Sequence, residues 1–253
     1  MIKITVPGAA GKMGKTIIEQ ILKDTDLSLI GAVEFKGHDS IGESIGKIKI
    51  SDDFVFVAKE SDAIIDFTTP EATLYHLEVA QKYGKAIVIG TTGILESGID
   101  KIKTSSKTIP IVFAPNMSIG VNLLFKLVDE VANVLSDYDI EIIEAHHNQK
   151  KDAPSGTALE IAEILSKKLN LQQIYGRAGH VGARKKEIGI HSVRAGDIIG
   201  DHTVLFVGQG ERLEIIHRAH SRETFAAGAI RAAKWIVDKK PGLYTMQDVL
   251  GLR

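Results

Sequence analysis

The chain has 253 residues, of which 44% are hydrophobic and 25% charged, values typical of a folded globular enzyme and not of a disordered chain. Lysine and arginine (31) nearly balance aspartate and glutamate (32), so no overall charge attracts nucleic acid or an anionic membrane. Cysteine is absent, which excludes disulfides, thiolate metal sites and cysteine nucleophiles. The sequence enters a strand pattern at once, and no apolar run could cross a bilayer, so we expect a cytoplasmic protein.

The first half of the chain alternates short apolar runs with helical patterns. A strand at 2–6 leads through glycines into a helix at 15–22, and a second strand at 27–33 ends on Glu34. Strands alternating with helices favour a parallel sheet built of βαβ units. Further strands are expected at 53–58, 63–67, 86–89 and 110–113, and further helices at 71–83 and 96–105.

The second half of the chain has a different pattern. Gly208-Gln-Gly210 joins two alternating runs and predicts a hairpin, which is an antiparallel connection. We therefore expect an α/β protein with a Rossmann-like parallel sheet domain and a smaller α+β domain with a mixed or antiparallel sheet. The predicted strands are 139–145, 188–193, 202–207 and 212–219, and the predicted helices are 121–135, one ending near 169, and 225–237.

The glycine turn after the first strand favours dinucleotide binding. Glycines let a backbone approach a pyrophosphate, and free N–H groups at the following helix N-terminus face it. The spacing Gly8, Gly11, Gly14 departs from the common G-x-G-x-x-G, so a plain tight connection stays possible. Glu34, at the end of the second strand, is placed to accept hydrogen bonds from an adenosine ribose, although a solvated charge is the alternative.

The residues after Glu34 bear on the choice between NADH and NADPH. An arginine there would favour the 2′-phosphate of NADPH, but the chain has Phe35 and Lys36, which favours NADH without excluding NADPH. Two further segments, 90–92 and 114–117, begin where a strand ends, the edge at which open α/β sheets bind ligands. Ordinary turns would explain them equally well.

The stretch from Glu141 to Ala158, E-I-I-E-A-H-H-N-Q-K-K-D-A-P-S-G-T-A, concentrates groups that select an anion. It combines two imidazoles, two ammonium groups and a helix start that Ser155 or Thr157 can cap. Adjacent histidines point apart in a strand or helix, and no metal-binding spacing accompanies them, so no metal is expected. Each residue also has an ordinary structural explanation, and only their convergence favours a catalytic anion site.

The same stretch resembles the signature of the 4-hydroxy-tetrahydrodipicolinate reductase (dihydrodipicolinate reductase) family. The resemblance also covers the glycine turn, Gly90-Thr91-Thr92-Gly93, and Arg194-Ala-Gly-Asp197, and so nearly the whole chain. The matching positions of the stretch are Glu141, Glu144, His146, Lys150, Asp152 and 154–158.

The resemblance implies a division into a dinucleotide-binding domain, 1–117 with 226–253, and a substrate-binding domain, 118–225, that forms a homotetramer. It implies NAD(P)H-dependent reduction of a cyclic imine dicarboxylate, with loss of water, in lysine and diaminopimelate biosynthesis. His146 and Lys150 would supply protons, and His147, Gly156 and Thr157 would bind substrate carboxylates. The cofactor residues would be Gly8, Ala9, Ala10, Gly11, Lys12, Met13, Glu34, Gly90, Thr91, Thr92, Ala114, Pro115, Asn116 and Met117.

Two alternatives stay open. Another amino-acid-pathway NAD(P) dehydrogenase is the enzymatic one, although the acylating semialdehyde enzymes need a thiol that this chain lacks. A non-catalytic dinucleotide-sensing protein would keep the glycine turn and Glu34 but would not need the spacing of His146 and Lys150.

Overall fold

The computed structural model describes residues 1–252, and the chain divides into two compact units. The first unit comprises residues 1–119 and 222–253, and the second comprises 120–221. Each unit has a core of its own, so each is described by itself. None of the helices within residues 1–252 is both long enough and apolar enough to span a membrane.

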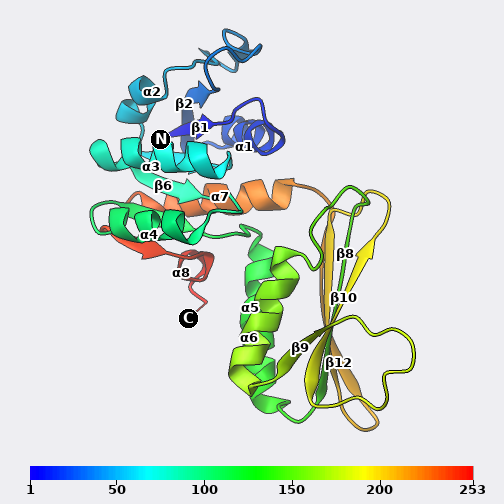
Figure 1. Cartoon of the computed structure of the whole chain (residues 1–253). Coiled ribbons are helices and arrows are strands. Elements are labelled where there is room, and N and C mark those ends of the chain that lie inside the picture. Colours follow the sequence, from blue (N-terminus) through cyan, green and yellow to red (C-terminus); the bar gives the residue numbers. More distant parts are fainter. Residues whose placement is uncertain (253) are drawn as a thin grey trace. The chain divides into compact units, whose positions relative to one another are not determined.

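The first unit is built on a six-stranded parallel sheet, as the βαβ pattern predicts (Figure 1). Because all strands run the same way, their carboxyl ends share one edge. The strand order is β13-β7-β6-β5-β1-β2, with β1 at Ile2–Pro7, β2 at Leu27–Val33, β5 at Ala63–Asp66, β6 at Ala86–Ile89, β7 at Pro110–Phe113 and β13 at Gly242–Tyr244. A small hairpin, β3 (Ser44–Ile45) and β4 (Ile48–Lys49), forms a separate two-stranded sheet that packs against the core of this unit.

Helices cover both faces of this sheet, because neighbouring strand residues point to opposite sides. In β5, for example, Ile65 belongs to one core cluster and Ile64 to the other. One cluster includes residues of α1 (Lys12–Lys23), α7 (Glu223–Ile236) and α8 (Met246–Leu250). The other includes residues of α2 (Phe54–Glu60), α3 (Pro70–Lys82) and α4 (Glu96–Ser105).

The prediction of a strand at 53–58 is wrong, because this segment forms α2. The alternation of Phe and Val suggests a strand, but the side chain of Asp53 accepts a hydrogen bond from the Phe56 N–H (2.9 Å) and so caps a helix. Phe54 and Ala58 are buried at helical i, i+4 spacing, whereas Phe56 is 67% exposed. The local cap therefore outweighs the period-2 pattern.

The second unit contains a five-stranded mixed sheet, with the order β12-β11-β8-β10-β9. The predicted hairpin around Gly208 and Gly210 is confirmed, since β11 and β12 pair antiparallel, whereas β8, β10 and β9 run parallel to one another. Strand β9 was not predicted from the sequence. The strands are β8 at Asp139–His146, β9 at Gln172–Tyr175, β10 at Glu187–Arg194, β11 at Gly200–Val207 and β12 at Arg212–Ala219.

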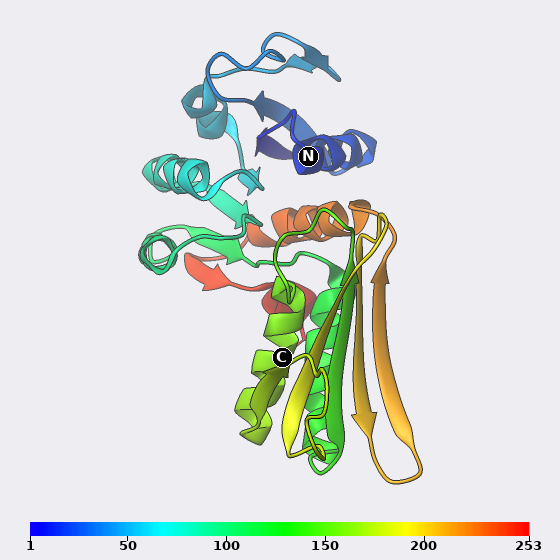
Figure 2. The same cartoon turned by 45° about the vertical axis from the view of Figure 1, so that its right-hand side comes forward.

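Two helices, α5 (Ile119–Val134) and α6 (Gly156–Leu169), lie on one side of this sheet in both views (Figures 1 and 2). Alternate β8 residues therefore face the helices, and Ile140 and Ile142 share a core cluster with them. The other face of the sheet lacks such a cover within the unit. Its partly exposed apolar side chains include Ile143 (39%), Val193 (44%) and Ile216 (45%).

Candidate active site

The glycine turn of the first unit is shaped by two close backbone approaches. Gly8 has a φ of +69°, a conformation that favours glycine. A Cβ atom on Gly14 would lie 2.0 Å from the Gly8 carbonyl oxygen, so only glycine lets α1 begin this close to the end of β1. Gly11 precedes α1 and has no side chain to cap it. The first N–H groups of α1 thus lack a side-chain acceptor at the N-cap, as a phosphate-binding turn requires.

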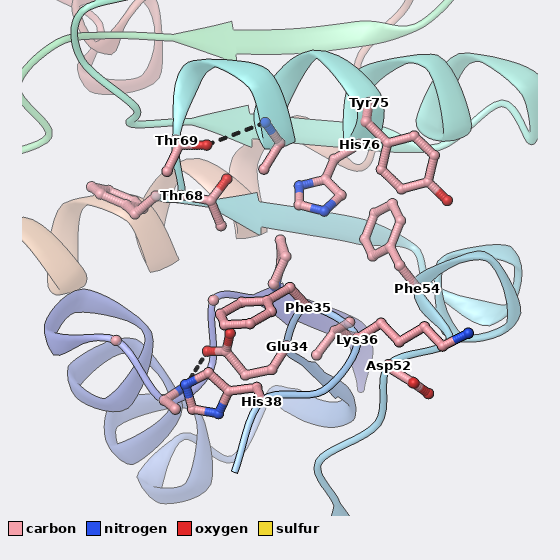
Figure 3. A pocket seen from close by; sticks show the side chains of 17 residues that line it. Glu34, Phe35, Lys36, His38, Asp52, Phe54, Thr68, Thr69, Tyr75 and His76 are labelled. Atoms are coloured by element: carbon pink, nitrogen blue, oxygen red, sulfur yellow. Dashed lines mark hydrogen bonds between the residues drawn. The ribbon is translucent and has the colours of Figure 1, made fainter. Parts of the chain in front are cut away.

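A pocket of roughly 700 Å³ opens beside this turn (Figure 3). Glu34 lines it, and its Oε1 accepts a hydrogen bond from the Ala10 N–H (2.8 Å). Aromatic side chains provide apolar walls, and a carboxylate beside a glycine turn suits a ribose that follows a pyrophosphate. An adenosine dinucleotide therefore fits the residues present. The lining also includes Gly8, Gly11, Phe35, Lys36, His38, Phe54, Thr68, Thr69, Tyr75 and His76.

The remaining predicted cofactor residues lie elsewhere along the same sheet edge. The segments 90–92 and 114–117 follow β6 and β7, which are neighbours in the sheet, and the Ala114 N–H donates to the Ile89 carbonyl (3.2 Å). Neither segment lines the pocket beside Glu34. The side chains of Ala9 and Met117 are buried in the core, whereas Lys12 and Thr92 are exposed. Only the backbone of the two buried residues could meet a ligand.

In the second unit, the end of β8 places two titratable side chains on the helix-facing side of the sheet. Glu144 is fully buried, and its Oε2 lies 2.6 Å from the Nδ1 of His146, whose side chain is 11% exposed. Burial lowers the pKa of His146, and the neighbouring carboxylate of Glu144 opposes that shift. The two residues are separated by one position, the spacing that puts strand side chains on one face.

Arg194, at the end of β10, holds the Glu144 carboxylate in a two-pronged contact. Its two terminal nitrogens lie 2.8 Å from Oε2 and Oε1, and the Ser155 N–H donates to Oε1 (3.1 Å). Burial raises the pKa of Glu144, but the hydrogen bonds from Arg194 and His146 outweigh it and bring this pKa down to about 2. Glu144 is therefore ionised throughout the physiological range.

A second buried histidine packs against His146. His202, on β11, is 3% exposed, and its ring meets that of His146 edge to face with centroids 5.2 Å apart. Burial, and then the charge of His146, lower the pKa of His202 to about 3, so this ring is neutral. Its Nε2 lies 3.0 Å from Ser155 Oγ, which caps α6 by accepting from the Ala158 N–H (3.2 Å). Of the two predicted caps, Ser155 occupies the N-cap position.

The loop between β8 and α6 carries the other predicted residues. Lys150 is half-buried and pairs with Asp152 (2.9 Å), whereas Lys151 is exposed. His147 is half-buried, and Gly156 and Thr157 form the first turn of α6. All of these residues lie within one short segment that begins at the His146–Glu144 pair.

Three polar residues around His146 were not predicted from the sequence to have a role of their own: Glu144, Arg194 and His202. Ser155 was predicted only as a possible helix cap. The sequence could have indicated two of these residues. Glu144 and Arg194 both lie in the motifs that carry the family resemblance, and Glu144 is two positions before His146, the spacing that puts strand side chains on one face. In the first unit, four residues that line the pocket were also not predicted, because the sequence offers no pattern for them: Thr68, Thr69, Tyr75 and His76.

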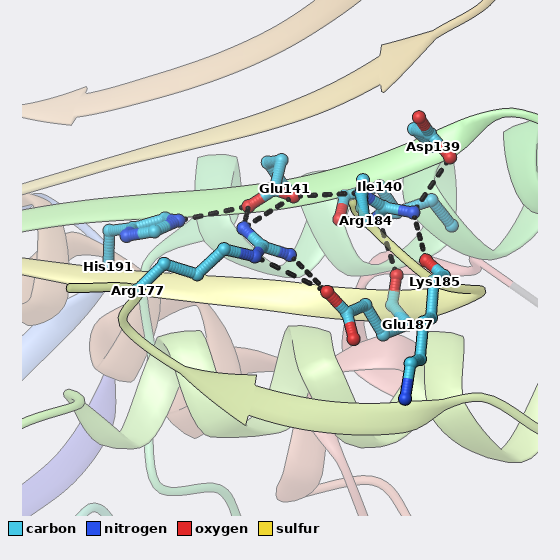
Figure 4. Close-up of polar contacts among 8 residues, drawn as sticks. All are labelled: Asp139, Ile140, Glu141, Arg177, Arg184, Lys185, Glu187 and His191. Atoms are coloured by element: carbon cyan, nitrogen blue, oxygen red, sulfur yellow. Dashed lines mark hydrogen bonds and ion pairs between the residues drawn. The ribbon is translucent and has the colours of Figure 1, made fainter. Parts of the chain in front are cut away.

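A different glutamate of β8, Glu141, anchors a loop on the opposite face of the sheet (Figure 4). Arg177 and Arg184 donate to its carboxylate at 3.0 and 3.1 Å, and His191 Nε2 lies 2.9 Å from it. Arg177 also donates a hydrogen bond to the Glu187 carboxylate (2.8 Å). The loop at 176–186 is thereby fastened to the outer face by charge-assisted hydrogen bonds.

Glu144 makes the stability of the fold sensitive to acid. Its pKa is about 2 in the folded protein and 4.5 ordinarily, so the unfolded chain takes up the proton first. The contribution of this group is complete above about pH 5 and is lost as the pH falls towards 2, with a slope of at most about 1.4 kcal/mol per pH unit. We expect the difference in unfolding free energy between wild type and Glu144→Gln to shrink between pH 5 and 3 in urea titrations. A constant difference would contradict this.

The fold and these sites define a class of protein. A parallel sheet with a glycine turn, an acid at the end of its second strand and a separate unit carrying a histidine–lysine loop is the organisation of an NAD(P)-dependent oxidoreductase. Residues 2–117 match the family model described as dihydrodipicolinate reductase, N-terminus, and residues 120–250 match that of the C-terminus. The chain belongs to the dihydrodipicolinate reductase family.

Known relatives agree along the full length. The chain is 51% identical to the 4-hydroxy-tetrahydrodipicolinate reductase of Syntrophus aciditrophicus and 49% identical to that of Geotalea daltonii, with all of each chain covered. Among solved structures, it is similar to the dipicolinate-bound dihydrodipicolinate reductase of Paenisporosarcina sp. TG-14, with a TM-score of 0.80, 25% identity and 98% of each chain covered.

Proposed function

We propose that this protein reduces 4-hydroxy-tetrahydrodipicolinate to tetrahydrodipicolinate, with loss of water, in lysine and diaminopimelate biosynthesis. Family membership gives the reaction class, and one observation supports the proposed site: the buried Glu144 lies 2.6 Å from His146 at the start of the loop that carries Lys150. The compartment we propose is the cytoplasm, where a reductase of this class has a supply of reduced nicotinamide.

The first unit would hold the cofactor. The glycine turn and the start of α1 (Gly8, Ala9, Ala10, Gly11, Lys12, Met13) would meet the pyrophosphate, and Glu34 the adenosine ribose. The segments Gly90 to Thr92 and Ala114 to Met117, at the same sheet edge, would face the nicotinamide half. A bound reduced nicotinamide supplies the hydride; the protein positions it.

The second unit would bind the substrate and supply protons. A ring that accepts hydride develops negative charge on a neighbouring atom, and a positioned acid can neutralise it. His146 would be that acid, and Lys150 a second proton donor. The two substrate carboxylates would be met by His147 and by the first N–H groups of α6 at Gly156 and Thr157, an arrangement that favours anions.

A coupled assay tests the function directly. The unstable substrate is generated in situ from pyruvate and aspartate semialdehyde, and consumption of the reduced nicotinamide is followed by its absorbance. We expect decay that depends on both substrate and enzyme. Folded protein that binds NADH but causes no decay would reject the reductase and favour a dinucleotide sensor.

We further propose that NADH is the preferred cofactor. Glu34 presents a carboxylate to the pocket, which would repel a 2′-phosphate, and the next residue, Phe35, is 69% exposed and brings no charge. Lys36 lines the pocket and leaves NADPH usable. We expect a lower KM for NADH than for NADPH, with similar kcat, in the same assay. A clear preference for NADPH would reverse the assignment.

The open face of the second unit's sheet leads us to propose a homotetramer. Ile143, Val193 and Ile216 leave a partly apolar surface on the side away from α5 and α6. Burial of that surface against other copies would remove it from water. Sedimentation equilibrium should give four times the monomer mass, and Ile216→Glu should lower the mass. A monomeric wild type would refute the proposal.

A further inference from the structure

The contacts of Glu144 point to a function for residues that the proposed reaction does not itself use. We propose that Glu144 and Arg194 are positioning residues that hold His146 with its hydrogen on Nδ1, so that the proton of the reaction passes through Nε2. This inference rests on the proposed function, because it gives direction to the proton transfer assigned to His146.

The first step is the hydrogen between Glu144 and His146. Glu144 receives donors on both oxygens: His146 and Arg194 on Oε2, and Arg194 and the Ser155 N–H on Oε1. An ionised carboxylate only accepts hydrogen bonds, so the hydrogen of the 2.6 Å contact belongs to Nδ1 of His146. Neutral His146 is therefore the Nδ1–H tautomer, and its protonated form carries the exchangeable proton on Nε2.

The second step is the action of Arg194. Its planar fork matches both oxygens of Glu144 at 2.8 Å, a geometry that a lysine cannot reproduce. The same arginine donates to the Asp152 carbonyl oxygen (2.6 Å), in the loop that carries Lys150. Arg194 thus keeps Glu144 ionised and at the same time ties the loop to the end of β10.

Packing then holds the ring of His146 in place. His202 meets it edge to face, and a Cβ atom added to Gly200 would lie 3.1 Å from His146 Nε2. The charged or titratable groups that act on His146 are Glu144, Lys150, Arg194 and the neutral His202, and Asp152 pairs with Lys150. Of these groups, only Glu144 accepts a hydrogen bond from the His146 ring, so Glu144 alone determines which ring nitrogen carries the hydrogen.

The test reads the tautomer in the wild-type protein, without substrate. With 15N-labelled histidine, long-range 1H–15N correlation spectra distinguish a protonated from a bare ring nitrogen. Above the pKa of His146 we expect protonated Nδ1 and bare Nε2. Neutral histidine free in water mostly carries its hydrogen on Nε2, so the expected pattern is not the default. Protonated Nε2, or an average of both forms, would overturn the proposal.

Glu144→Gln tests the cause. An amide has one acceptor oxygen and cannot satisfy both donors of Arg194, and its NH₂ group can donate to a bare Nδ1. We expect His146 to shift towards the Nε2–H tautomer, and kcat to fall by between about 10- and 10⁴-fold, the range seen when an orienting partner of a functional histidine is lost. Loss of the carboxylate removes an influence that raises the pKa of His146, so the basic limb of the kcat profile should move to lower pH.

Glu141→Gln is the matched control. Glu141 lies on the same strand and is also held by arginines, but it faces the opposite side of the sheet. Its substitution should leave the tautomer and the pH profile unchanged. If Glu144→Gln retains the Nδ1–H pattern and the wild-type profile, the positioning role is refuted. If Glu144→Gln does not fold, Arg194→Lys replaces it, and we expect His146 to show a mixture of both tautomers in that variant. The wild-type spectrum remains a test of the proposal in either case.

The spectra also separate this inference from the proposed function. A protein that shows the Nδ1–H tautomer but consumes no reduced nicotinamide would reject the reductase and retain the geometry at Glu144. A protein that turns over normally with His146 in the other tautomer would retain the reductase and reject the positioning residues.

Discussion

His146→Gln should lower kcat by about 10²- to 10⁴-fold, the usual contribution of a general acid, while the Kd for NADH stays at its wild-type value. Glutamine can still contact Glu144, but it cannot release a proton near neutral pH. The proposed cofactor residues belong to the first unit and His146 to the second, so cofactor binding has no reason to change. Steady-state kinetics and NADH fluorescence titration measure the two quantities.

His147→Gln is the comparison for that experiment. His147 is half-buried in the same loop but does not contact Glu144, and we assign it to a substrate carboxylate. It should raise KM more than it lowers kcat. A wild-type kcat for His146→Gln, or identical profiles for the two variants, would remove His146 from the catalytic role.

Lys150→Ala should produce a second large loss, again of about 10²-fold or more in kcat. Alanine removes an ammonium group that pairs with Asp152 at 2.9 Å, and since that aspartate side chain is 60% exposed, the fold should lose little stability. The loss should therefore appear in turnover and not in the urea midpoint.

Lys151→Ala provides the control, because it removes an equal charge from the adjacent, exposed position of the loop. Near-wild-type kinetics are expected there. If the two alanine variants lost the same activity, the loop's overall charge would matter and not a proton donor at position 150.

The two glutamates of β8 illustrate how one strand serves two purposes. Glu144 and His146 point towards α5 and α6, where burial makes each contact strong, whereas Glu141 points to the outer face and fastens the 176–186 loop. Gly189 leaves space for the Glu141 carboxylate, since a Cβ atom on Gly189 would lie 1.8 Å from Glu141 Oε2. Both carboxylates have a lowered pKa: burial opposes it, but hydrogen bonds from arginines and a histidine prevail.

Local interactions explain what the sequence by itself determined. The turn at Gly8 to Gly14, the alternation of strands and helices, the Gly208–Gly210 hairpin and the stretch 141–158 each depend on residues close together in the chain. Segment 53–58 is the exception, because its Phe and Val alternation suits a strand, whereas the Asp53 cap and the burial of Phe54 and Ala58 at i, i+4 spacing favour a helix.

Tertiary structure alone decided how the site is completed. Arg194 is fifty residues from Glu144, and the two meet only because β8 and β10 pair in parallel with Arg194 opposite His146. His202 reaches His146 through the antiparallel pairing of β11 with β8, which sets it opposite Glu144. Such register depends on which apolar faces are buried together over the whole sheet. The sequence thus pointed to His146 as the candidate acid, and the fold of the second unit determined that its Nδ1 contacts Glu144.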